Sequence, residues 1–223
     1  MALTSQSRAV HEFASRLQLR TDLHLARKTW HMAMGMFIAL TYFFVCSQST
    51  AILLLGFFLG LDLFLETLRL NVPAVNERVM RHWGMIMRSC ERDRLSGVPF
   101  YISSSLLAVA IFPKPVAVLS ILLLAYGDPI ASLVGVIYGD RVKRFASGKS
   151  WIGSLAGVLA CMAVSLVFLN LIQISGWHLV ILTAVAGLAG GLSELLPLEL
   201  DDNFVIPVVS GFVIWATFIL LGI

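Results

Sequence analysis

Charged residues are scarce in this chain of 223 residues. They make up 13% of it, against roughly a quarter in an ordinary soluble domain, and this scarcity excludes a typical soluble enzyme. Cysteine is rare as well, because only Cys46, Cys90 and Cys161 are present, far apart and without metal-ligand spacing. The sequence therefore supports neither a disulfide framework nor a zinc site, and the cysteines are interpreted as reduced packing residues. The sequence also lacks internal repeats, low-complexity segments and the apolar core of a signal peptide.

Hydrophobic residues make up 58% of the chain and occur in long continuous runs. In lipid, only helices and closed barrels satisfy their backbone hydrogen bonds, and runs that do not alternate argue against a barrel. The sequence therefore predicts an all-α polytopic membrane protein with about seven transmembrane helices. The expected spans are Trp30–Cys46, Thr50–Leu65, Pro99–Phe112, Val116–Gly139, Trp151–Gln173, His178–Leu196 and Phe204–Ile223.

The basic residues are segregated to one side of these expected spans. Of the 16 lysines and arginines, only Lys114 falls in a connection on the opposite side. The positive-inside rule assigns the basic side to the cytoplasm, so the amino terminus is expected inside and the carboxyl terminus outside. Residues 1–29 are predicted to form a cytoplasmic amphipathic segment, with further cytoplasmic loops near 66–98, 140–150 and 197–203. The net charge of +3 is small, and nucleic acid is not expected as a partner.

The triplet Gly127-Asp128-Pro129 places a carboxylate midway along an expected span. A charge at that depth costs several kcal/mol unless it is paired or hydrated, so Asp128 is a functional candidate. Proline removes an amide donor and restricts the residue before it, so the triplet is also expected to break the helix. A broken helix exposes backbone groups that can line a polar cavity.

Further carboxylates lie near the cytoplasmic ends of the spans. Asp62 and Glu66 share a helix face through their i, i+4 spacing, and they either pair with Arg69 or have a functional role. Glu194 lies near the inner end of the sixth span, and Asp201-Asp202-Asn203 directly precedes the seventh. A helix cap accounts for one of these three residues. Adjacent carboxylates repel unless a cation neutralises them, and hard oxygen ligands suit Mg²⁺, so the cluster is expected to bind a metal.

Basic and small residues on the same side are candidates for binding phosphate. Arg27-Lys28 precedes the first span, and Gly148-Lys149-Ser150 leads through Gly153-Ser154 into the fifth. These residues are either topology anchors or phosphate ligands at a helix N-terminus. The spacing is not that of a Walker A loop. Carboxylates for a metal and cations for phosphates imply a nucleoside triphosphate, with a second substrate that comes from the bilayer.

Together, the motifs resemble the CTP-dependent lipid-alcohol kinases, a family that includes dolichol, phytol, farnesol and yeast-type diacylglycerol kinases. The resemblance covers residues 27–211. It rests, in chain order, on Arg27-Lys28 with His31, Glu66 with Arg69, Gly127-Asp128-Pro129 with Gly135 and Gly139, Gly148-Lys149-Ser150 with Gly153-Ser154, and Glu194 with Asp202-Asn203 and Pro207. The chain departs from the family at Trp151-Ile152, where relatives often carry an acidic residue. The resemblance implies transfer of the γ-phosphate of CTP to an isoprenoid alcohol or diacylglycerol, with Mg²⁺ as cofactor, in a single catalytic domain over residues 30–223.

The resemblance also implies roles for the candidate residues. Mg²⁺ would be held by residues with oxygen ligands, namely Asp128, Asp201, Asp202 and Asn203. The phosphates would be bound by Arg27, Lys28, Gly127, Gly135, Lys149, Ser150, Gly153 and Ser154. Asp128 is the first choice for the base that accepts the hydroxyl proton, and Glu194 or Glu66 is the second. His31 either touches a phosphate or is structural.

Other functions stay open at this point. A phosphatidate cytidylyltransferase also uses CTP and Mg²⁺ at the membrane, although its His-Gly-Gly and Asp-Arg-x-Asp pattern is absent from this sequence. An ion-coupled transporter would use Asp128 and Glu194 but usually shows an inverted repeat, and a non-catalytic lipid scaffold would not need the acidic cluster. The residues alone do not identify the lipid alcohol, do not distinguish CTP from ATP, and leave a homo-oligomer open.

Overall fold

The computed structural model describes residues 25–139, 142–145, 147–196, 198 and 200–223. These residues form α2 (Leu25–Phe44), α3 (Gln48–Asn71), α4 (Pro73–Trp83), α5 (Val98–Ile111), α6 (Lys114–Tyr138), α7 (Trp151–Leu171), α8 (Gly176–Ser193) and α9 (Asp202–Leu221), with the 3-10 turn η2 (Ser89–Arg92) between α4 and α5. Every helix except α4 and η2 overlaps one of the expected spans, and the all-α prediction is confirmed. Of the expected amphipathic segment 1–29, only the last five residues are described, and they begin α2.

Several helices are suited to a membrane. Within the described residues, five are long and apolar enough to cross one, namely α3, α6, α7, α8 and α9. The apolar helix α5 is shorter, and α2 carries Arg27, Lys28 and His31 in its first two turns. Large apolar side chains such as Phe57 and Val167 are 65% and 71% exposed on the outside of the bundle. An apolar exterior of this kind identifies an integral membrane protein.

The central helix is α6. It packs against α2, α5, α7, α8 and α9, and every residue in the stretch 116–125 is buried. The break expected at Gly127-Asp128-Pro129 is wrong, because α6 continues through Pro129. A proline removes the hydrogen bond to the carbonyl four residues earlier, and a helix surrounded by other helices tolerates that loss. Asp128 is therefore presented by a continuous helix.

Glycines allow α7 to approach its neighbours closely. A Cβ atom at Gly157 would lie 2.9 Å from the Cβ of Ala131 in α6. A Cβ atom at Gly191 of α8 would lie 2.5 Å from the Cα of Val158 in α7. Small residues at such contacts are typical of helix packing in membranes, where close backbone approach provides the attraction.

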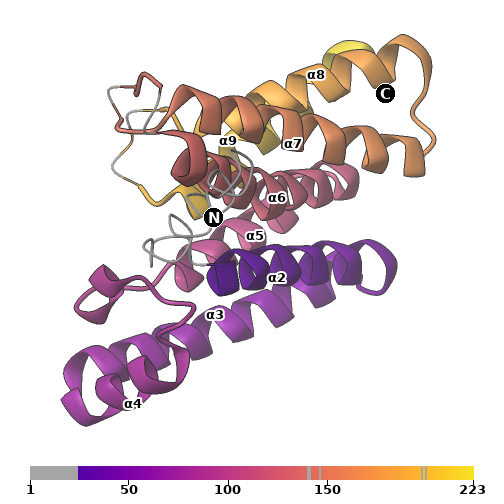
Figure 1. Cartoon of the computed structure of the whole chain (residues 1–223). Coiled ribbons are helices and arrows are strands. Elements are labelled where there is room, and N and C mark those ends of the chain that lie inside the picture. The colour runs from indigo at the N-terminus through magenta and orange to yellow at the C-terminus, as the bar shows by residue number, and fades with distance from the viewer. Residues whose placement is uncertain (1–24, 140–141, 146, 197, 199) are drawn as a thin grey trace, which may run out of the picture.

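The two ends of the bundle differ in polarity. In Figure 1, the short α2–α3 and α7–α8 connections lie at one end, and α4 and the segments 142–145 and 147–150 lie at the other. Lys114 belongs to the first end, where its ammonium donates to the carbonyls of Phe43 and Cys46 at 3.3 and 3.0 Å. The other described basic residues lie in helix turns and connections toward the second end. The polar second end is where the candidate site is found.

We expect Gly191→Ala to destabilise the bundle, because its methyl group would force α7 and α8 apart. Overpacking of this kind costs about 1–3 kcal/mol, so the melting temperature of the purified protein in detergent should fall. Gly56→Ala is the matched control, since a Cβ atom there has nothing within 4 Å. Equal melting temperatures for the two variants would contradict this packing.

Candidate active site

A polar cavity of about 400 Å³ opens at the basic end of the bundle. This volume lies within the range of small-molecule sites, roughly 300–1,000 Å³. Its wall contains charged and small polar residues from three helices (α6, α7 and α9) and three connections, among them Arg88, Asp128, Ser132, Gly135, Arg144, Gly148, Lys149, Ser150, Gly153, Ser154, Glu194 and Asp202. The structure therefore brings together most of the sequence-predicted residues from 127–202.

Lys149 joins two carboxylates in this cavity. Its ammonium donates to Oε2 of Glu194 at 3.1 Å and to Oδ2 of Asp202 at 2.8 Å. The hydroxyl of Ser154 donates to the other oxygen of Glu194 at 2.8 Å. Burial lowers the pKa of Lys149, but the two carboxylates raise it to a net value above its usual range, so the side chain stays cationic. The cluster ties the start of α7 to the end of α8 and the start of α9.

A tight turn carries Lys149 to this position. The amide of Phe145 donates to the carbonyl of Lys149 at 2.8 Å, and the amide of Gly148 donates back to Phe145 at 2.9 Å. Gly148 has a φ of 80°, a left-handed conformation that glycine adopts without strain. Ser150 then caps α7, since its hydroxyl accepts from the amide of Gly153 at 3.2 Å. The positive N-terminal end of α7 therefore lines the cavity.

Two of the predicted metal ligands have structural partners instead. Asp201 caps α9, because its Oδ1 accepts from the amide of Asn203 at 2.9 Å. Asn203 is buried and donates its side-chain amide to the carbonyl of Gly97 at 3.2 Å. Asp128 and Asp202 do face the cavity. In the part of the chain that the structure describes, no three His, Cys, Asp or Glu side chains converge as a ready-made metal site requires.

The basic pair before the first span is not on the cavity wall. The guanidinium of Arg27 donates to both carboxylate oxygens of Glu91, at 3.0 Å each. Lys28 is close enough to Asp128 for the two charges to attract. The Nε2–H of His31 donates to a backbone carbonyl of α6 at 3.3 Å, which favours the structural interpretation of this histidine.

The predicted glycines bring α6 and α7 into contact. A Cβ atom at Gly127 would lie 2.5 Å from Sγ of Cys161, and one at Gly153 would lie 2.8 Å from the carbonyl oxygen of Ala131. A Cβ atom at Gly135 would lie 3.0 Å from Oγ of Ser150. Helix packing is therefore sufficient to explain the glycines, although Gly135 and Gly153 also line the cavity.

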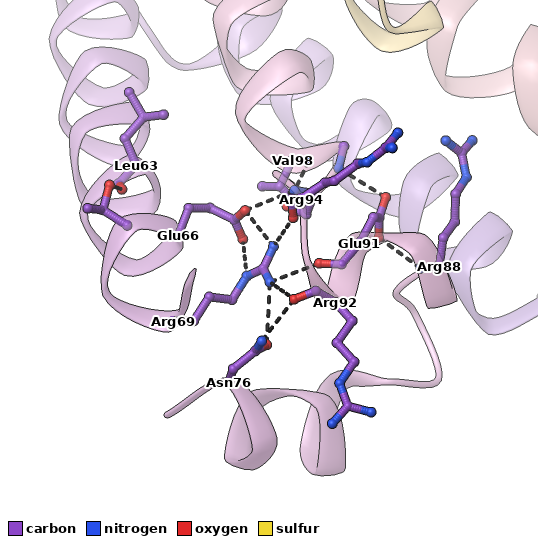
Figure 2. A network of polar contacts seen from close by, with 12 residues as sticks. Leu63, Glu66, Arg69, Asn76, Arg88, Glu91, Arg92, Arg94 and Val98 are labelled. Carbon is purple, nitrogen blue, oxygen red and sulfur yellow. Dashed lines mark hydrogen bonds and ion pairs between the residues drawn. The ribbon is translucent and has the colours of Figure 1, made fainter. Parts of the chain in front are cut away.

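Glu66 lies outside the cavity, in the separate network shown in Figure 2. Arg69 donates to both of its carboxylate oxygens at 2.7 Å, and both side chains are buried. The same guanidinium donates to the carbonyls of Glu91 and Arg94 at 2.9 and 2.7 Å. Glu66 in turn accepts from the amide of Ser96 at 2.8 Å. This pair fixes the end of α3 to the segment 91–96, and the structure does not bring Glu66 to the predicted base position.

Sequence reasoning misses two arginines on the cavity wall, Arg88 and Arg144. Nη1 of Arg88 lies 3.9 Å from Oδ2 of Asp201, and Arg144 donates to the carbonyl of Gly148 at 2.9 Å. Both residues occur among other basic residues whose charge the membrane orientation explains equally well. The sequence therefore contains no signal that separates them from their neighbours.

Comparison with known proteins identifies the family. The profile described as the cytidylyltransferase family matches residues 1–196. A CTP-dependent diacylglycerol kinase of Eremothecium gossypii is 32% identical over 210 residues, which cover 86% of this chain and 66% of that protein. Another CTP-dependent diacylglycerol kinase, from Schizosaccharomyces pombe, is 30% identical over 205 residues, which cover 86% of this chain and 92% of that protein. The chain belongs to this family, among its CTP-dependent lipid kinases.

A plant relative extends the same conclusion. A probable phytol kinase of Oryza sativa is 29% identical over 198 residues, which cover 85% of this chain and 64% of that protein. The chain thus spans about two thirds of the Eremothecium and Oryza proteins and nearly all of the Schizosaccharomyces protein. No solved structure matches it. The predicted resemblance to CTP-dependent lipid kinases is confirmed.

We expect Arg69→Met to destabilise this lipid kinase strongly, because it leaves the buried Glu66 carboxylate without its partner. Breaking a buried ion pair on one side costs about 3–5 kcal/mol. Thermal unfolding in detergent should show a large decrease in melting temperature. The control is Arg92→Met. The side chain of Arg92 is exposed, and its backbone carbonyl, which accepts from Arg69 and Asn76, is not changed by the substitution. A melting temperature for Arg69→Met equal to that of the control would refute the structural role of the pair.

Proposed function

We propose that the chain transfers the γ-phosphate of CTP to the hydroxyl of a lipid alcohol, either diacylglycerol or an isoprenoid alcohol, and releases CDP. The observation that carries this proposal is the convergence of Asp128, Lys149, Glu194 and Asp202 on one cavity at the end of an apolar bundle. A metal-bound triphosphate needs both kinds of charge, because carboxylates can bind the metal ion while cations neutralise the phosphates. The positive-inside rule supports placing this basic end, and the amino terminus, on the cytoplasmic side where CTP is available.

The cations of the cavity would bind the triphosphate. Lys149, Arg88 and Arg144 line it, and the N-terminal turn of α7 adds a partial positive charge. Phosphoryl transfer depends mainly on positioning and on neutralising charge that spreads over the phosphate oxygens. In this proposal Lys149 exchanges part of its contact with Glu194 and Asp202 for the arriving phosphate.

Asp128 and Asp202 are the residues that fit Mg²⁺. In sites of this class the ion is bound by one or two carboxylates, with water and substrate phosphates completing its octahedral shell. A cavity whose wall contains both Asp128 and Asp202 fits that description. Once bound, the ion would neutralise charge on the β- and γ-phosphates. Asp201 and Asn203 are left out of this set because each holds a structural contact.

Asp128 is also the proposed general base. The hydroxyl oxygen of the lipid attacks the γ-phosphorus, the bond from that phosphorus to the oxygen bridging to the β-phosphate breaks, and the hydroxyl proton passes to Asp128. CDP leaves with the bond electrons on its terminal oxygen. Glu194 is the second choice, because Lys149 and Ser154 already occupy its oxygens.

The direct test uses purified protein with Mg²⁺ and either γ-labelled CTP or γ-labelled ATP. Farnesol, phytol, a long polyprenol and diacylglycerol are supplied in turn, and label is counted in the lipid phase. We expect transfer that prefers CTP, selects among the alcohols and disappears with EDTA. If only α-labelled CTP with phosphatidic acid labels lipid, the protein is a phosphatidate cytidylyltransferase and the kinase proposal fails.

We expect Asp128→Asn to abolish γ-phosphate transfer while leaving the melting temperature unchanged. Removing a general base typically lowers kcat by about 10²–10⁴-fold, and loss of a metal ligand adds to this. Asp93→Asn, at an exposed carboxylate outside the cavity, is the control and should keep wild-type kcat. Wild-type turnover in Asp128→Asn would remove this residue from the mechanism.

A further inference from the structure

An apolar groove separates α2 from α3 at the side of the bundle. Here α2 packs mainly on α6, whereas α3 packs mainly on α5. The space between them consists of two adjoining cavities of about 430 and 350 Å³. Both cavities are lined by Met34, Ile38, Asp62, Leu65 and Ile102, so they form one continuous groove. Each volume falls within the range of small-molecule sites, roughly 300–1,000 Å³.

Asp62 is the one polar residue among the five that line both cavities. Its Oδ2 atom is buried and has no hydrogen-bond partner, a condition that only the hydroxyl of Thr183 shares among the side chains described. An unsatisfied buried polar group destabilises the folded protein, and a charged one does so more strongly. A carboxylate within a membrane-spanning helix marks a functional site by default. The groove therefore combines largely apolar walls with a buried carboxylate oxygen that has no hydrogen-bond partner.

We propose that this groove binds the lipid alcohol before transfer, with its hydrocarbon chain between α2 and α3 and its hydroxyl donating to Asp62. For the reaction, the hydroxyl leaves Asp62 and reaches Asp128 in the neighbouring cavity. The inference rests on the proposed kinase function and names the lipid site which that function requires. A neutral alcohol supplies the missing hydrogen-bond donor, whereas the phosphate of an anionic lipid would face an unpaired carboxylate. The arginines of the groove do not offset this, because Arg27 and Arg69 are paired with Glu91 and Glu66.

The groove borders the nucleotide cavity. Gly97 lies in the groove wall and accepts a hydrogen bond from Asn203, the residue directly after Asp202. Glu91 lies in the same wall and accepts from the amide of Arg88, whose side chain lines the cavity. The lipid and nucleotide sites therefore share a wall, which is the arrangement that transfer between an apolar and a polar substrate needs.

The binding test omits CTP, so that it does not depend on turnover. A diacylglycerol carrying a diazirine in one acyl chain is photolysed with the purified protein, and the labelled peptides are mapped. We expect label on α2 and α3, and unlabelled diacylglycerol should compete at least about tenfold better than phosphatidic acid with the same chains, as loss of one hydrogen bond to a charged group predicts. Asp62→Leu should erase this preference. Label confined to other helices, or equal competition by the two lipids in the wild type, would overturn the proposal.

The kinetic test makes the same substitution at two adjacent positions of α3, whose side chains point about 100° apart around the helix. Leu54 lines the groove, whereas Leu53 does not line it and is 73% exposed. Leu54→Trp should raise the KM for lipid by about tenfold, because the indole would occupy space that the hydrocarbon chain of the lipid needs. It should leave the KM for CTP unchanged. Leu53→Trp should change neither value. Equal lipid KM values for the two variants would overturn the groove as the lipid site.

The two tests separate failure of the groove from failure of the kinase function. Groove labelling without any γ-phosphate transfer would retain the lipid site and reject the kinase. Transfer together with labelling outside the groove would retain the kinase and reject the lipid site. Because photolabelling of the wild type needs no variant to fold, the proposal is testable even if Leu54→Trp is unstable.

Discussion

The contact of Lys149 with Glu194 and Asp202 is the interaction on which the site depends. Without this ammonium, the carboxylates at the end of α8 and the start of α9 would repel each other and Asp128 across a shared cavity. The contact also positions the N-terminal turn of α7, whose dipole and capped amides face the same space. One cation thus holds three helix ends together. In the proposed reaction, a triphosphate with its metal would bring other charges and would take over this neutralisation.

A rigid helix presents the central carboxylate. Asp128 lies on α6, which is packed by five other helices and continues through Pro129. Side chains on packed helices are held more precisely than those on loops. The cations differ in this respect, because Lys149, Arg88 and Arg144 come from connections between helices. Asp128 and Asp202 therefore lie on helices, whereas the cations proposed to bind phosphate lie in the connections.

Local pattern is enough to predict the helices and the main site, but not the pairing of charges across the fold. The spans follow from the length and composition of the apolar runs, and Asp128, Lys149 and Asp202 stand out because charge near an apolar segment needs a reason. Glu66 stands out equally, yet it forms an ion pair with Arg69, three residues later in the sequence. The carbonyls that complete that pair lie more than 20 residues further along the chain. Arg88 could not be predicted for the same reason, because only the tertiary packing places its side chain at the cavity.

The saturated ion pairs explain how the two proposed substrate sites can lie so close together. Arg27 with Glu91 and Arg69 with Glu66 stand where the groove meets the polar end of the bundle. Since each charge is already matched, this wall has little affinity for a free phosphate and does not draw the nucleotide toward the lipid chain. Asp62 on one side has a buried oxygen without a hydrogen-bond partner, and the cavity on the other side contains the cations that are proposed to exchange their partners for phosphate. In these two proposals, substrate selection depends on which charged groups are already paired and which are not.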